Sequence, residues 1–220
     1  MDCPQRPAAP AVASISGEIG SRRESVENPT LFQYLTAFVT IVLAIALSDM
    51  LLSAHRLIVA RRRVRWAVIP LAAALFALLN VLSEFFSVWV AGDVRSVSFP
   101  YLVLLVFVSA SCAMAAFAAL PDEVPPEGLD LWASYIDKHT YLYGILALGW
   151  TSDIARQILH HVETHRTMPP LVALQPYKSV IPIALFLILA WSKDRRVHAA
   201  GVWLLLALVV YFDFIGWTIS

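Results

Sequence analysis

The sequence predicts an all-α, polytopic integral membrane protein with six transmembrane helices. Of its 220 residues, 59% are hydrophobic and only 15% are charged, and the mean hydropathy is +0.70. This composition lies outside the range of soluble globular chains. Several separate apolar segments follow a polar N-terminal stretch. At about 20 residues for each crossing, six crossings use about 120 residues, which leaves no length for a sizeable soluble domain.

Two regions are predicted along the chain. Residues 1–29 are rich in Pro, Ala, Ser, Glu and Arg, so we expect a disordered tail, and residues 8–15 are too interrupted for a signal peptide. Residues 30–220 are expected to form a single transmembrane helical domain. Its helices are predicted at about 31–54, 66–91, 99–120, 133–156, 177–192 and 199–219.

The first two helices have clear signals. The first begins at Leu31 and ends before a basic run at 56–65. Trp66 and Trp89 bound the second, and at the helical rise they lie about 34 Å apart. Tryptophans at this spacing are typical of the two interfaces of a bilayer.

The third helix lies between Pro100 and Pro121, and its middle, 109–119, is almost entirely small residues. Small side chains let helix backbones approach closely. This pattern predicts a central position in the bundle.

The fourth helix has the weakest signal. Only 141–150 is cleanly apolar, so a crossing must include charged residues such as Asp153 and Arg156. Charges inside the membrane must face protein or water. The alternative is an interfacial helix, because the stretch around Trp132 has some amphipathic character.

The last two predicted helices differ in the length of their apolar runs. The fifth has a short apolar run, 180–191, and reaches the length of a crossing only with Tyr177 and Lys178 included. The sixth is long and apolar, and Asp213 is its only charge.

Basic residues in the loops predict the orientation. With six crossings, the loops after the first and fifth helices lie on the same side, which is expected to be cytoplasmic, with both termini outside. With five crossings these loops would fall on opposite sides. The basic residues are Arg56, Arg61, Arg62, Arg63, Arg65, Lys193, Arg195 and Arg196.

The loop at 120–130 is acidic and rich in proline. It is predicted on the same face as the arginine-rich loop, so we expect electrostatic contact between them. Asp130 is expected to start the fourth helix, where the helix dipole favours negative charge. Anionic lipid headgroups are possible ligands of these loops, at Arg61, Arg62, Arg63 and Arg65.

The two halves of the chain show a faint similarity. Residues 46–49 and 150–153 both end in Ser-Asp, and a potential cation follows each seven residues later. Val-Ile-Pro occurs at 68–70 and again at 180–182. This order is compatible with a 3+3 inverted repeat, which is typical of secondary transporters. The alternative is that Ser-Asp and Pro are simply common where helices meet loops.

Polar residues within the apolar segments are the candidates for function, because a mid-helix charge costs about 2.5–3.5 kcal/mol on insertion scales. The first, second and fourth helices each carry a polar stripe at helical spacing. These stripes are expected to converge on a hydrated centre. The predicted ion or substrate pathway consists of Asp49, Arg56, Asn80, Glu84, Asp153, Arg156, His160 and Asp213.

The alternative for these residues is structural. Asp49 with Arg56, and Asp153 with Arg156, would then be ion pairs that lock helix ends. Glu84 would lie near an interface where water reaches it.

Other kinds of site have less support. His161 and His165 are one helical turn apart, as in a metal site, but a solvated polar loop is the ordinary explanation for histidines at such a helix end. No pair of histidines is expected to face each other at depth, so haem is not predicted. An intramembrane enzyme using Ser48 or Ser53 is an alternative without a positive signature. No metal and no cofactor is therefore predicted.

Three runs of sequence resemble a set of uncharacterised bacterial multi-pass membrane proteins. They are Leu-Ser-Asp-Met-Leu-Leu-Ser-Ala-His-Arg-Leu (47–57), Arg-Arg-Val-Arg-Trp (62–66) and Leu-Pro-Asp-Glu-Val-Pro-Pro-Glu-Gly-Leu-Asp-Leu (120–131). The likeness spans much of the first 150 residues. It implies about six helices in a bacterial inner membrane, and it carries no activity.

The predicted function is a small solute or ion transporter or channel with intramembrane acids. The alternatives are a non-catalytic membrane partner or sensor subunit and an intramembrane enzyme. Sixteen basic residues balance sixteen acidic ones, so nucleic acid is not expected as a partner. The expected partners are the lipid bilayer and further copies of the chain, because six helices alone enclose little.

Overall fold

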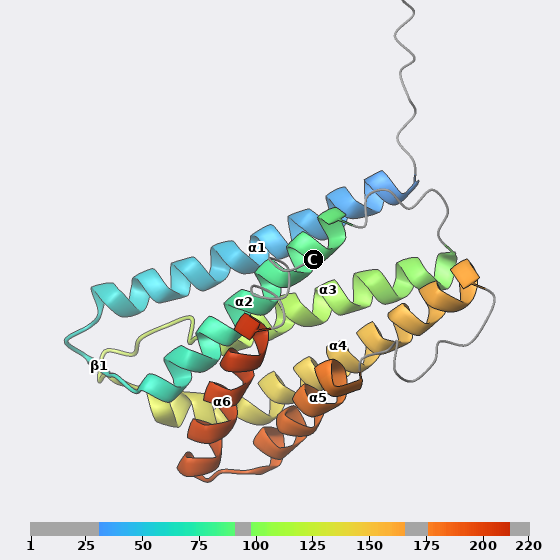
Figure 1. Cartoon of the computed structure of the whole chain (residues 1–220). Helices are drawn as coiled ribbons and strands as arrows, with labels where there is room; N and C mark the ends of the chain where they lie inside the picture. The colour runs from blue at the N-terminus through green and yellow to red at the C-terminus, as the bar shows by residue number, and fades with distance from the viewer. Residues whose placement is uncertain (1–30, 91–97, 166–175, 212–220) are drawn as a thin grey trace, which may run out of the picture.

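The computed structural model describes residues 31–90, 98–165 and 176–211, and within these ranges it is a helical bundle (Figure 1). The predicted tail lies outside the described residues. The elements are α1 (Leu31–Val59), β1 (Val64–Arg65), α2 (Val68–Val90), α3 (Phe99–Ala119), β2 (Leu129–Asp130), α4 (Leu131–His165), α5 (Pro176–Trp191) and α6 (Arg195–Val209).

The predicted helical class is confirmed, and each predicted helix has an observed counterpart. Two helices are longer than predicted. α1 continues five residues beyond the expected end, to Val59, because no Pro or Gly interrupts it. α4 runs without a break for 35 residues, and the next prolines, Pro169 and Pro170, follow its end.

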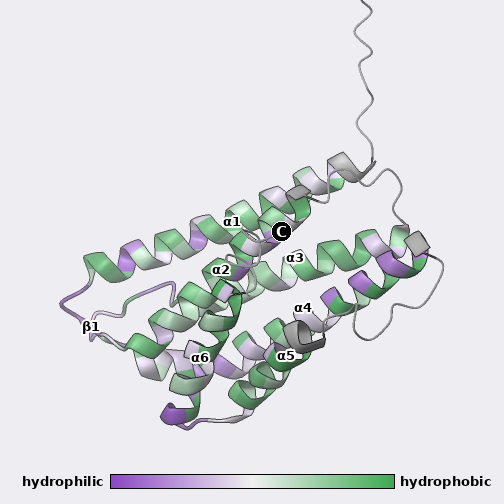
Figure 2. Ribbon diagram, in the orientation of Figure 1, coloured by the Kyte–Doolittle hydropathy of each residue, from purple (hydrophilic) through white to green (hydrophobic). Residues whose placement is uncertain are grey.

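Three helices are long and apolar enough to cross a membrane. They are Tyr34–Val59 within α1, Val68–Val88 within α2, and Phe99–Ala119, which is α3. The apolar part of α5, Val180–Trp191, is shorter. Figure 2 shows these helices as mostly hydrophobic, whereas hydrophilic residues occur along α4 and at the start of α6.

The outer surface of α1 is apolar and exposed. The side chains of Ile41, Ile45 and Ile58 are each more than half exposed. A soluble monomer rarely leaves such a continuous apolar surface in water. The exposed apolar side chains therefore fit a helix that faces hydrocarbon.

α3 occupies the central position that its small residues predict. It packs against α1, α2 and α4 (Figure 1). Ser111, Ala115 and Ala116 are buried on this helix. At Gly149 of α4, a Cβ atom would lie only 2.8 Å from the Cβ of Ser111. The backbones of α3 and α4 are therefore as close as small residues allow.

Side-chain caps define where three helices begin. Ser98 accepts a hydrogen bond from the Tyr101 backbone N–H at 3.3 Å at the start of α3. Asp130 accepts from the backbone N–H groups of Trp132 and Ala133 at 3.0 and 3.1 Å. At the start of α6, Asp194 accepts a hydrogen bond from the Arg196 backbone N–H at 2.9 Å. The prediction that Asp130 starts the fourth helix is confirmed, since its carboxylate satisfies free N–H groups there.

Consecutive helices alternate in direction, so the α1–α2, α3–α4 and α5–α6 connections lie at one end of the bundle, called here the basic face. Two short parallel strands, β1 and β2, join two of these connections, with Val64 opposite Leu129. Gly128 precedes β2 with a φ of 105°, and a Cβ there would lie 2.9 Å from the Arg63 carbonyl oxygen. Only glycine fits this turn without strain.

The predicted contact between the arginine-rich loop and the acidic loop is confirmed at the basic face. Arg65 Nη1 lies 3.8 Å from Asp130 Oδ2. Arg56 donates a hydrogen bond to the Asp122 carbonyl oxygen at 2.8 Å. The loops therefore hold each other by both backbone and side-chain contacts.

The two Val-Ile-Pro segments have different positions in their helices. Val68 begins α2, so the first segment opens a helix. The second opens the apolar part of α5 but lies inside the helix, which begins at Pro176 and contains Pro182. The inverted repeat stays a prediction.

We expect Gly149→Ala to weaken the packing of α3 against α4, and Gly144→Ala to be its control. A methyl group at position 144 meets no atom within 4 Å. Either change gains about 1 kcal/mol of helix propensity, but overpacking at position 149 costs about 1–3 kcal/mol. Thermal unfolding in mild detergent should therefore give Gly144→Ala the higher melting temperature. Equal melting temperatures of the two variants would contradict the close approach of α3 and α4 at Gly149.

Candidate functional site

A buried cluster of polar side chains lies between α2, α3 and α4. It consists of Glu84, Ser109, Asp153 and Arg156 and is called here the central cluster. Glu84 and Arg156 are each 8% exposed, and Ser109 is 1% exposed. Glu84 is therefore not at a water-exposed interface, which was the structural alternative for this residue. Such burial is costly unless each polar group has a partner.

Ser109 is the hydrogen-bond partner of Glu84. Its Oγ lies 2.9 Å from Glu84 Oε1 and 2.9 Å from the Leu105 carbonyl oxygen. The hydroxyl has a single proton, so it donates fully to one of these acceptors at a time. When Glu84 is a carboxylate, Ser109 donates to it. When Glu84 carries a proton, Glu84 donates to the Ser109 oxygen and Ser109 donates to Leu105.

In both charge states, Glu84 therefore keeps a hydrogen bond to Ser109 through Oε1 in the same backbone arrangement. Only the hydroxyl hydrogen of Ser109 has to rotate. A residue that binds and releases a proton inside a tight bundle needs this property, because an unsatisfied buried partner costs about 1–3 kcal/mol.

Asp153 and Arg156 form a charged pair on α4. Arg156 donates from Nε and Nη2 to Asp153 Oδ1 at 3.0 and 2.6 Å. Gln157 donates to the other carboxylate oxygen at 2.7 Å. The charges of both Arg156 and Asp153 act on the Glu84 carboxyl. Three members of the predicted stripe on the fourth helix are therefore hydrogen-bonded to one another, and of these Arg156 is buried, Asp153 is half-buried and Gln157 is exposed.

Tyr101 and His160 extend the central cluster toward the end of the bundle opposite the basic face. The Arg156 guanidinium lies 5.9 Å from the centre of the Tyr101 ring. The rings of Tyr101 and His160 are 5.7 Å apart. Eight residues of α3 separate Tyr101 from Ser109, a rise of about 12 Å. Polar groups thus continue from the middle of α3 to its N-terminal end.

Asn80 lies one turn before Glu84 on α2, and its side chain is held by hydrogen bonds to neighbouring residues. It accepts a hydrogen bond from Trp150 Nε1 at 3.2 Å and donates to the Phe76 carbonyl oxygen at 2.9 Å. Phe186 of α5 packs against both Phe76 and Trp150. This apolar contact borders the central cluster on the side of the basic face.

The structure does not bring all predicted pathway residues together. Asn80, Glu84, Asp153, Arg156 and His160 lie in one region, between or beside α2, α3 and α4. Asp49 and Arg56 of α1 lie elsewhere. Among the described residues no ion pair joins these two side chains, because Arg56 is exposed and binds the acidic loop instead. Asp213 lies outside the described residues.

A second group of buried polar residues, absent from the sequence prediction, lies near the basic face. It consists of Tyr135, His139 and Tyr143 of α4 and His198 of α6, and is called here the aromatic cluster. His139 and His198 are 3% and 0% exposed, and their rings are 5.4 Å apart. Tyr135, His139 and Tyr143 follow each other at intervals of four residues, which places them on one helix face.

His139 and His198 face each other near the basic face, a contact that was not predicted. The physical reason is that α6 crosses the first turns of α4, which a single sequence does not reveal. Both ring nitrogens of His198 make hydrogen bonds, to Tyr135 and to the Ser192 carbonyl oxygen. His198 is therefore not free to bind haem iron.

Metal and nucleophile sites find no support in the part of the chain that the structure describes. There, no group of three or more His, Cys, Asp or Glu residues is arranged to hold a metal ion. The side chain of His165 lies outside the described residues. The buried hydroxyl of Ser53 has no hydrogen-bond partner, so no base activates it.

Comparisons with protein-family models, with curated proteins and with solved structures found no match. The resemblance to uncharacterised bacterial membrane proteins stays a prediction. Function is therefore argued from the two polar clusters alone.

We expect Ser109→Ala to destabilise the protein and Ser111→Ala to have little effect. Removing the Ser109 hydroxyl leaves Glu84 buried without its partner, at a cost of about 1–3 kcal/mol. Ser111 donates only to the Phe107 carbonyl oxygen of its own helix. Chemical unfolding in detergent micelles would compare the two variants. A Ser109→Ala protein as stable as Ser111→Ala would show that Glu84 does not depend on Ser109.

Proposed function

We propose that the chain is a multi-pass inner-membrane protein that moves protons, or a small ion coupled to them, through its helical bundle. Glu84 is the residue that takes up and releases the proton. The observation that carries this proposal is the position of the Ser109 hydroxyl between Glu84 and the Leu105 carbonyl oxygen. This arrangement satisfies Glu84 with or without its proton.

The charged pair on α4 supports the same role. The Arg156 guanidinium and the Asp153 carboxylate lie 2.6 Å apart and carry opposite charges. Together with Glu84, the pair has a net charge of −1 when Glu84 is ionised and zero when Glu84 carries a proton. The central cluster thus becomes neutral when Glu84 binds a proton. A neutral cluster costs less free energy inside an apolar bundle than a charged one.

Close packing favours a proton over a larger solute as the species that passes. A Cβ atom at Gly149 would lie only 2.8 Å from the Cβ of Ser111, so α3 and α4 leave no room for a larger side chain at that position. A proton needs only a succession of exchangeable groups. Tyr101 and His160 supply such groups between Arg156 and the end opposite the basic face.

We also propose that all six helices cross the membrane and that the basic face is cytoplasmic. Eight basic residues lie in or beside the α1–α2 and α5–α6 connections, which share one end of the bundle. On α4, Tyr135, His139, Tyr143 and Arg156 are buried among other helices, which is how polar side chains are accommodated in a bilayer.

A reporter fused after Ser220 tests this topology. Six crossings with a cytoplasmic basic face place the C-terminus outside, so we expect periplasmic phosphatase activity and no cytoplasmic fluorescence. A second fusion within the basic α1–α2 connection should give the opposite pattern. A fluorescent, phosphatase-negative C-terminal fusion would contradict the topology.

We expect Glu84→Gln to abolish proton flux in proteoliposomes, because the amide keeps the shape of the side chain but cannot bind and release a proton. The matched control is Glu163→Gln, which changes an exposed glutamate on α4. Internal pH is followed with a trapped dye after an imposed pH gradient. Equal flux through wild-type and Glu84→Gln proteins of the same stability would exclude Glu84 as the carrier.

A further inference from the structure

The aromatic cluster contains a continuous chain of hydrogen bonds. The hydroxyl oxygens of Tyr143 and Tyr135 are 2.7 Å apart. The Tyr135 oxygen lies 2.7 Å from Nδ1 of His198. Nε2 of His198 lies 2.8 Å from the Ser192 carbonyl oxygen, in the connection between α5 and α6. The chain therefore leads from the bundle interior to the basic face.

The chemistry of the groups fixes the direction of every bond. A carbonyl oxygen only accepts, so Nε2 of His198 carries the hydrogen and donates to Ser192. In the neutral imidazole Nδ1 is then an acceptor, and Tyr135 donates to it. The Tyr135 oxygen in turn accepts from Tyr143. All three hydrogens point toward the basic face.

We propose that Tyr143, Tyr135 and His198 form a proton relay between the bundle interior and the basic face. This inference rests on the proposed function, because it supplies the cytoplasmic half of the same proton path. A proton that binds the Tyr143 oxygen displaces the Tyr143 hydrogen to Tyr135, and the Tyr135 hydrogen to Nδ1. His198 becomes an imidazolium and then releases its Nε2 hydrogen to water at the basic face. Return of the imidazole hydrogen from Nδ1 to Nε2, and rotation of the two tyrosine hydroxyls, restore the starting arrangement. One proton is bound and one is released.

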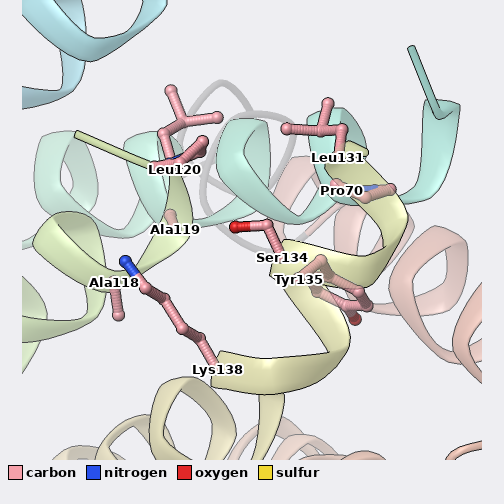
Figure 3. Close-up of a pocket in the computed structure, with 9 residues that line it drawn as sticks. Pro70, Ala118, Ala119, Leu120, Leu131, Ser134, Tyr135 and Lys138 are labelled. Atoms are coloured by element: carbon pink, nitrogen blue, oxygen red, sulfur yellow. The ribbon is translucent and has the colours of Figure 1, made fainter. Parts of the chain in front are cut away.

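The outer end of the relay reaches the surface. Ser192 is only half-buried. A hollow at the basic face is lined by Ser134, Tyr135 and Lys138 (Figure 3), with room for about one water molecule. The Ser134 hydroxyl and the Lys138 ammonium point toward the C-terminal end of α3, at Ala119 (Figure 3). Water therefore has access to the helix turn that carries Tyr135.

The surroundings of His198 suit a proton acceptor. His198 precedes the predicted crossing at 199–219, and burial lowers its pKa below the ordinary value, with His139 acting in the same direction. The Ser192 carbonyl oxygen and Asp194 oppose this shift. The Trp132 ring lies between His198 and the guanidinium of Arg195. In neutral His198, Nδ1 accepts the hydrogen bond from Tyr135 and can receive a proton along it.

An aromatic side chain closes the inner end. The Tyr143 ring stacks on Phe186, which also contacts Trp150 and is 0% exposed. Phe186 thus lies between the relay and the central cluster. The two halves of the path are joined only when this side chain moves or when water passes it.

Two matched tyrosine variants test the relay. Tyr135→Phe removes the central hydroxyl, whereas Tyr141→Phe removes an exposed hydroxyl from the same helix. Proton flux is measured in proteoliposomes beside Glu84→Gln. The tautomer of His198 is read independently by ¹⁵N NMR of histidine-labelled protein in nanodiscs, with the signal assigned by His198→Gln.

We expect Tyr135→Phe to lower flux about tenfold and Tyr141→Phe to leave it unchanged. The His198 signal should show a hydrogen on Nε2 alone at neutral pH and on both nitrogens in acid. Loss of flux in Glu84→Gln with full flux in Tyr135→Phe would leave the proposed function standing and overturn the relay. If the wild-type protein carries no proton flux, the proposed function fails. In the NMR measurement, a hydrogen on Nδ1 of His198 at neutral pH would overturn the relay.

Discussion

The need to give every buried polar group a partner inside an apolar bundle is the constraint on which this structure depends. Water is not available there, so an unpaired donor, acceptor or charge is costly. Glu84 is satisfied by Ser109, and Arg156 by Asp153. Since Glu84 lies on α2 and Ser109 on α3, their hydrogen bond also joins these two helices, whereas the Asp153–Arg156 pair lies within α4. The same contacts that stabilise the bundle therefore create its only described charged interior, the central cluster.

α4 connects the two polar regions of the molecule. Its face toward the other helices carries the aromatic cluster near the basic face and the charged pair near the opposite end. Between them, Trp150 and Phe186 provide an apolar contact. This order resembles a path with an acceptor at each end and a barrier in the middle. A single helix can supply both halves because its 35 residues exceed the thickness of a bilayer core.

The sequence predicted the six helices well, because long apolar runs bounded by Pro, Trp or charge are local signals. It predicted Glu84, Asp153 and Arg156 as candidates because charges are conspicuous in such runs. It failed for the Asp49 and Arg56 pair, since helical spacing places two side chains on one face but does not choose their partners; the nearby acidic loop binds Arg56 instead. His198 was missed because its side-chain partner Tyr135 lies 63 residues away and meets it only in the folded bundle.

The most direct test of proton movement is the reversal potential of the purified wild-type protein in a planar bilayer. If the bundle conducts protons, the reversal potential should follow the pH gradient by about 59 mV for each pH unit, the value for a single charge. Exchange of sodium, potassium or chloride between the two chambers should not move it. A current that does not exceed that of the lipid alone, or a reversal potential that ignores the pH gradient, would contradict the account.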